Sequence, residues 1–110
     1  MLTGSIPIAT IWGTWSENVE VWDVETDTLM DLTHVTEITL MLRDPFTGTT
    51  ELSTTMSAGN IVIPSMGIIQ WRIEVGTMST LLPRLYEILL LLDGDGDRTS
   101  LFMGPVSIVE

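Results

Sequence analysis

The sequence predicts an all-β fold, either an antiparallel β-sandwich or a small barrel, with about six to eight short strands and one short helical turn. Two observations carry this prediction. Short segments in which apolar and polar residues alternate run through most of the chain, and clusters of Gly, Pro, Asp and Asn separate them. Apolar residues also make up 45% of the 110 residues, which suits a single domain, residues 1–110, with one core.

The first segments lie close to the N-terminus. Apolar residues dominate residues 5–12, and we expect residues 1–15 to form an N-terminal arm or an edge strand. Residues 16–24 alternate, which predicts a strand with Val19 and Val21 on the same face.

The middle of the chain alternates between connections and strands. Residues 23–31 hold acids and no basic residue, so we expect a solvated connection. Residues 37–43 alternate as a half-buried strand does. The sequence Asp-Pro-Phe-Thr-Gly at residues 44–48 predicts a turn, because Pro presets φ and Gly accepts a positive φ. Residues 49–55 are rich in Thr and predict the next strand.

Residues 61–63 predict a brief strand that ends at Pro64. The clearest alternation follows, in residues 69–75. We expect its inward face to carry Ile69, Trp71, Ile73 and Val75. Residues 76–82 have room for a short helical turn before Pro83.

Residues 84–92 are ambiguous, because their Leu, Ile and Glu content also suits a helix. The Asp and Gly residues at 93–97 and the β-like residues 99–109 favour a strand and a hairpin instead. The run of residues 88–92 is apolar at every position, so both faces of this strand need cover. That cover comes from the centre of a sandwich or from a subunit interface.

The charge balance excludes whole classes of partner. The chain has 15 acidic residues against 4 basic ones, a formal net charge of −11. It has no lysine, and its arginines are scattered singly. Nucleic acids and anionic membranes both need clustered Lys and Arg, so we expect neither as a partner.

Other absences narrow the chemistry further. With 0 Cys and 1 His, the chain is expected to form no disulfide, no thiolate nucleophile and no cluster of His and Cys ligands. No basic residue precedes Arg43, so a signal peptide is not expected. The longest aliphatic run is too short to cross a bilayer.

Three sets of residues are candidates for reactive sites. The Asp residues at 93–97 alternate with Gly, but the glycine and glutamate that a calcium-binding EF-hand loop requires are missing, so a hairpin turn is favoured over a calcium site. The acids between Glu17 and Asp31 show no spacing that selects a catalytic pair. His34 lacks a positioned nucleophile and is expected on the surface or in a turn. We therefore expect no enzyme, no catalytic residue, no metal and no cofactor.

The remaining candidates are contact residues. Trp71 fits the inward face of its strand and is expected to pack in the core. Trp12, Trp15 and Trp22 could belong either to the core or to a partner contact, because exposed Trp anchors interfaces and stacks on sugars. The predicted interface residues are Trp12, Trp15, Trp22, Ile88, Leu90 and Leu92.

Several short motifs also follow one another in order over residues 19–109. They are Asp31-Leu32-Thr33, a strand ending at Arg43, Leu52-Ser53-Thr54, Gly59-Asn60-Ile61, the strand at 69–75, a Thr/Leu turn at 77–81, Tyr86-Glu87-Ile88-Leu89, the hairpin at 93–96 and Gly104-Pro105-Val106. In this order the chain resembles a family of small β domains found among virion proteins of tailed bacteriophages and prophages. Leu85 departs from the family, which usually has Gly before the Tyr.

The resemblance implies an immunoglobulin-like sandwich that serves as a virion building block, without catalytic residues. We therefore expect a non-enzymatic structural protein of a tailed-bacteriophage virion, in the tail, baseplate or fibre-attachment region. Its expected partners are other virion proteins and copies of itself, in a homo-oligomer within the particle. The alternatives are a capsid decoration or head-associated protein, and a carbohydrate-binding module for host surface glycans.

Overall fold

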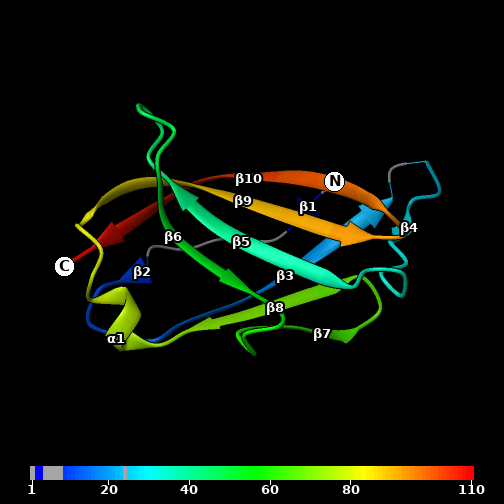
Figure 1. Ribbon diagram of the computed structural model, residues 1–110, viewed down its shortest axis with the longest axis horizontal. Helices are drawn as coiled ribbons and strands as arrows, with labels where there is room; N and C mark the ends of the chain where they lie inside the picture. The colour runs from blue at the N-terminus through cyan, green and yellow to red at the C-terminus, as the bar shows by residue number, and fades with distance from the viewer. Residues whose placement is uncertain (1, 4–8, 24) are drawn as a thin grey trace.

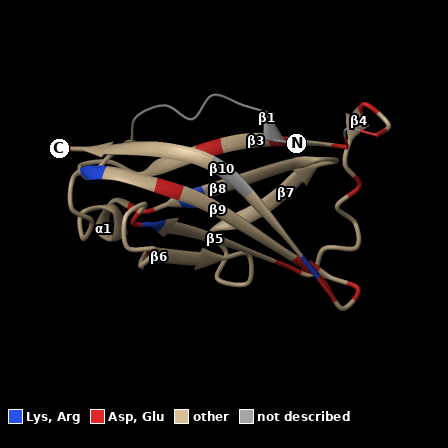
Figure 2. Cartoon of the chain, turned by 90° about the horizontal axis from the view of Figure 1, so that it is seen from above, with Lys and Arg blue, Asp and Glu red and all other residues tan. Residues whose placement is uncertain are grey.

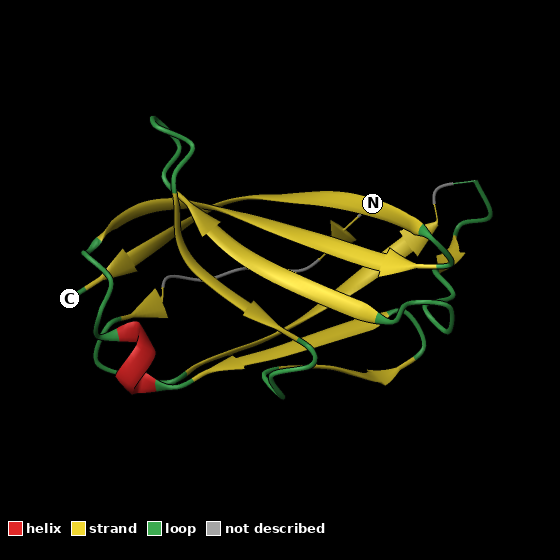
Figure 3. Cartoon of the chain, viewed as in Figure 1, coloured by secondary structure: helices red, strands yellow, loops and turns green. Residues whose placement is uncertain are grey.

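The computed structural model describes residues 2–3, 9–23 and 25–110, and the fold of this part is almost entirely β (Figure 3). The strands and the single helical turn are β1 (Leu2–Thr3), β2 (Ala9–Thr10), β3 (Trp15–Asp23), β4 (Thr28–Leu29), β5 (Glu37–Arg43), β6 (Thr50–Thr55), β7 (Ile61–Ser65), β8 (Ile68–Ile73), α1 (Val75–Met78), β9 (Arg84–Gly94) and β10 (Asp97–Val109). The all-β prediction is confirmed.

The strands form two facing sheets (Figures 1 and 2). The first sheet has the order β1-β3-β8-β7, with β4 attached to β3, and it is strongly curled. The second sheet has the order β2-β10-β9-β5-β6. Neighbouring strands are antiparallel except for the short β2, which runs parallel to the end of β10.

The core lies between the two sheets and is filled by alternate residues of the strands. In β5 the inward side chains Ile38, Leu40 and Leu42 are fully buried. At the opposite layer, the rings of Trp15 and Trp71 meet edge to face, with centroids 5.5 Å apart. The core position predicted for Trp71 is confirmed, as is the shared buried face of Val19 and Val21.

The strand predicted for residues 84–92 is confirmed, and so is its hairpin. Asp95 and Gly96 form the two-residue connection, with φ values of 51° and 79°. Two consecutive positive φ values define the tight turn whose twist matches that of paired strands, and Asp-Gly is a preferred sequence for it. The helical turn expected within residues 76–82 is also present, as α1.

Three expectations need correction or fall outside the described residues. Val75 leaves the strand: it begins α1 and its side chain is 43% exposed, because the chain turns directly after Glu74. Strand β7 continues through Pro64 to Ser65, with irregular pairing that spares the missing N–H. Of the segment expected at residues 5–12, residues 5–8 lie outside the described residues, and residues 9–10 form β2.

In the part of the chain that the structure describes, no helix has the length and apolar character needed to cross a membrane.

Candidate interaction surfaces

The acidic side chains and His34 do not gather into a metal-binding group. Among the described residues, no group of three or more His, Asp and Glu side chains could hold a metal ion. His34 is exposed in the turn before β5, as expected from the sequence. Glu25 and Asp31 are also exposed, on the connection between β3 and β5.

The turn between β9 and β10 is organised by an ion pair. Arg98 Nε donates to Asp93 Oδ1 over 2.6 Å, and Arg98 Nη2 donates to Asp93 Oδ2 over 3.2 Å. These bonds to the guanidinium lower the pKa of Asp93. One of the three carboxylates of the Asp/Gly segment is therefore already neutralised, which agrees with a hairpin turn.

Four of the six predicted interface residues are buried within one copy of the chain. Trp15 is 4% exposed, Ile88 and Leu90 are fully buried, and Leu92 is 5% exposed. These four side chains fill the core and have no surface to offer a partner, which corrects the interpretation made from the sequence.

The other two predicted residues lie far from each other. Trp12 is 70% exposed beyond β2, whereas the half-buried Trp22 pairs with Leu29 of β4. Strands β2 and β4 lie at opposite ends of the molecule (Figure 1). The structure therefore leaves Trp12 and Trp22 as two separate candidate contacts.

The apolar run in β9 does have apolar residues on both faces. Its outward face, however, carries residues other than the predicted Ile88, Leu90 and Leu92. Leu89 and Leu91 are half-buried on the outer face of the second sheet, and Leu85 on the same face is 46% exposed. Met41 of β5 lies beside Leu89 in the strand register. The sequence alone did not show which alternate residues of β9 point outward. Once Tyr86 is placed inward, every odd-numbered residue of β9 points outward.

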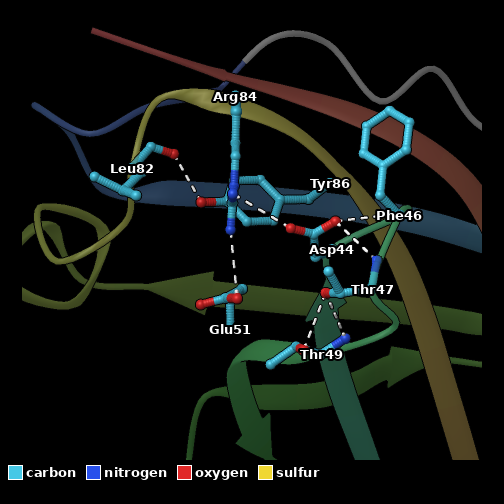
Figure 4. Close-up of polar contacts among 8 residues, drawn as sticks. All are labelled: Asp44, Phe46, Thr47, Thr49, Glu51, Leu82, Arg84 and Tyr86. Atoms are coloured by element: carbon cyan, nitrogen blue, oxygen red, sulfur yellow. Dashed lines mark hydrogen bonds and ion pairs between the residues drawn. The ribbon is translucent and has the colours of Figure 1, made fainter.

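Several hydrogen bonds and ion pairs organise the hairpin between β5 and β6 (Figure 4). The Asp44 carboxylate is nearly buried and accepts hydrogen bonds from the backbone N–H groups of Phe46, at 2.8 Å, and Thr47, at 3.3 Å. The backbone N–H of Gly48 also donates to the Asp44 carbonyl over 2.8 Å. The backbone bonds to its carboxylate, and then Arg84, lower the pKa of Asp44.

Arg84 connects this hairpin to the rest of the second sheet. Its Nη1 lies 3.3 Å from Asp44 Oδ2, and its Nη2 lies 3.3 Å from Glu51 Oε1. The guanidinium also lies 5.3 Å from the centre of the Tyr86 ring, within the range of a cation–π contact. Tyr86 in turn donates its hydroxyl proton to the Leu82 carbonyl over 2.7 Å.

These contacts hold an aromatic side chain in water. Phe46 is 93% exposed, at an uncharged hairpin tip formed by residues 45–49. The hairpin projects beyond the sheet at the end where α1 lies (Figure 1). The turn is readable from the sequence, whereas its support by Arg84 is not, because Arg84 is distant in the sequence.

A shallow apolar hollow lies towards the other end of the molecule. It has a volume of about 470 Å³ and lies between the connection before β5 and the β7–β8 hairpin. Its lining residues are Leu32, Thr33, Val35, Ile63, Ser65 and Met66. The lining contains no charged residue, and Met66 on the rim is 63% exposed.

No family model, curated protein or solved structure matches this chain. The resemblance to phage virion domains therefore remains a prediction made from the residues.

Proposed function

We propose that this chain is a non-enzymatic structural protein of a tailed-bacteriophage virion, and that its fold is an immunoglobulin-like sandwich. Strand order supports the fold. In immunoglobulin-like domains, the first, second, fifth and fourth main strands form one sheet, and the third, sixth and seventh form the other. The orders β1-β3-β8-β7 and β10-β9-β5-β6 correspond to this pattern, with β6 as the additional strand of variable-type domains.

Tyr86 also supports this fold. Many such domains have a Tyr near the start of the sixth strand whose hydroxyl bonds to backbone a few residues upstream, as Tyr86 does with Leu82. The chain differs from antibody domains in having no cysteine. Its core contains the Trp15–Trp71 pair, which links two strands of the first sheet.

The observation that carries the structural role is a set of apolar side chains on the outer face of the second sheet, a face that also carries the Arg43–Glu87 ion pair. Leu85, Leu89, Leu91 and Met41 lie there, and no described segment forms a further layer over them (Figure 2). Burial of apolar surface stabilises an assembly by about 25 cal/mol per Å². Docking on this face would supply that energy, and it suits a building block of a particle.

Mass spectrometry of purified phage particles tests the proposal. We expect the chain in density-purified particles at a fixed ratio to the major capsid protein, and still there after a high-salt wash. Antibody labelling would then separate a tail or baseplate position from the head-associated alternative. Absence of the chain from intact particles would refute the structural role.

The apolar face can be tested with a matched pair of variants. The double substitution Leu85→Thr and Leu91→Thr keeps strand propensity but removes apolar surface, so we expect poor incorporation into particles. Leu82→Thr is the control, because Leu82 is 66% exposed and lies outside this face. Equal incorporation of both variants would argue against docking through the face.

Trp12 favours a second candidate function, binding of host surface glycans. Its 70% exposure leaves the indole ring available to stack on a sugar. Tryptophan fluorescence titrated with host polysaccharide tests this role, with Trp12→Phe as the control. A response that the control lacks would support glycan binding, and an unchanged signal would leave Trp12 as a protein contact.

A further inference from the structure

We propose that Phe46 of one copy inserts into the apolar hollow of the next copy, the hollow lined by Leu32, Val35, Ile63 and Met66. Copies of the chain would then associate head to tail. This inference rests on the proposed structural role and deepens it by naming a second copy as one partner and the residues that make the contact.

The Phe46 hairpin has the properties of a preformed anchor. The ring is 93% exposed, although exposing a large aromatic side chain to water is unfavourable. At the same time its backbone is held by Asp44 and, through Asp44, by Arg84. A side chain presented on a braced turn loses little conformational freedom on binding, and aromatic anchors that fill pockets dominate binding energy.

The hollow matches this anchor in chemistry. Leu32 at its floor is 3% exposed, and Val35 and Ile63 pack against the core. Thr33, Ser65 and Met66 complete a lining without charge. An aromatic ring entering this space would find apolar atoms below it and would separate no ion pair.

The distribution of charge favours a second copy in the head-to-tail orientation. Arg43 and Arg84 lie at the base of the Phe46 hairpin and neutralise carboxylates there. The opposite end holds the acids of the β3–β5 connection and of the β9–β10 turn (Figure 2). Joining two acidic ends would place like charges together, and head-to-tail contact avoids this in chains of net charge −11.

Phe46 and the hollow lie on different parts of the chain, so the contact between two copies is heterologous. Such contacts produce closed rings when the rotation between copies closes, and open filaments when it does not. Both arrangements occur in repetitive particles. A contact of this kind also predicts how two defective variants behave when they are mixed.

Sedimentation velocity of the full chain tests the contact. We expect the wild-type to associate with rising concentration, and Phe46→Ala and Met66→Asp each to weaken association at least about tenfold. Leu82→Ala is the control for loss of an exposed apolar side chain, and Ala58→Asp is the control for one added charge. Circular dichroism confirms that each variant folds, which the exposure of both residues favours.

Mixing the two defective variants gives the decisive result. Phe46→Ala keeps an intact hollow and Met66→Asp keeps an intact Phe46, so together they should form one junction and stop at a dimer. A wild-type chain that stays monomeric up to about 1 mM would overturn the proposal, because even a contact with Kd near 1 mM would be populated there. Association unaffected by either variant, or the absence of dimer in the mixture, would also overturn it.

These outcomes are distinct from those that test the structural role. If the chain is present in purified particles but monomeric in solution, the proposed contact between copies is refuted and the proposed function stands. If the chain is absent from particles, the proposed function is refuted, whatever the oligomeric state of the chain in solution.

Discussion

Tyr86 links two kinds of stabilisation through one side chain. Its ring is buried in the core, whereas its hydroxyl donates to the Leu82 carbonyl over 2.7 Å. Tyr86→Phe removes only the hydrogen bond, and Leu82 is exposed enough for water to replace the donor. We therefore expect a loss of about 0.5–1.5 kcal/mol in the free energy of unfolding. Urea denaturation followed by tryptophan fluorescence measures it.

Tyr86→Ala provides the comparison, since it removes the ring as well. Loss of a buried aromatic side chain typically costs about 3–5 kcal/mol. If the two variants were equally destabilised, the hydroxyl rather than the ring would be the main contribution, contrary to the structure.

Asp44 should make stability depend on pH. Its folded-state pKa is lowered, first by the backbone N–H of Phe46. A lowered pKa means that the carboxylate stabilises the fold above its ordinary pKa of about 3.9, and that this contribution is lost as the pH falls through the lowered value. Asp44→Asn should therefore be less stable than the wild-type at pH 7, with the difference narrowing below about pH 4. Thermal denaturation across this range measures the difference.

Glu25→Gln is the matched control for this pH series. It removes one negative charge from an exposed connection, away from Arg84. A difference between wild-type and Asp44→Asn that stayed constant from neutral to acidic pH would show that the charge of Asp44 does not stabilise the hairpin.

At the scale of elements, the β9–β10 hairpin depends on its connecting glycine. Gly96 has a φ of 79°, and a Cβ added there would meet no atom within 4 Å. Gly96→Ala therefore carries only the backbone penalty of the left-handed region, about 1–2 kcal/mol. Gly76→Ala in α1 also meets no atom within 4 Å but lies outside that region, so it should be neutral or stabilising by up to about 1 kcal/mol. Thermal unfolding of both variants checks the contrast.

Equal destabilisation by the two substitutions would mean that the positive φ of Gly96 does not set the cost of its replacement. Gly94 is limited by space instead, since a Cβ there would overlap the backbone of His34. Steric overlap, at Gly94, and backbone strain, at Gly96, are therefore separable within one hairpin.

Alternation was sufficient to predict the strands whose two faces differ. Residues 37–43 became β5 with unchanged bounds, and the ambiguous residues 84–92 became most of β9. Local pattern failed where the chain changes direction. Val75 continues the alternation in sequence yet starts α1, because the turn after Glu74 overrides it.

The candidate surfaces were harder to predict, since they depend on contacts between distant residues. Asp44 and Arg84 meet only because β5 and β9 are neighbours. The run at residues 88–92 required cover on both faces, but the sequence did not say which leucines point outward. The hollow joins the connection before β5 to the β7–β8 hairpin, and no local signal links those segments.

Over the whole molecule, the arginines and the acids are unevenly distributed. Arg43, Arg72 and Arg84 each pair with carboxylates, whereas among the described residues no ion pair joins an arginine to Glu25 or Asp27 of the β3–β5 connection. The end that holds the β3–β5 connection therefore remains the more negative one, and the uncharged Phe46 tip and apolar hollow are where two copies can meet with little repulsion.

Salt should consequently strengthen the association of this chain. Repulsion between copies of net charge −11 acts over about 30 Å at 0.01 M salt but only about 3 Å at 1 M, while burial of Phe46 does not depend on screening. We expect sedimentation velocity to give several-fold tighter association at high than at low NaCl concentration. Met66→Asp should associate at least about tenfold more weakly than the wild-type at both NaCl concentrations, because salt cannot restore a blocked hollow. Weaker association at high salt would instead mean that ion pairs between copies, and not the apolar insertion, hold the contact.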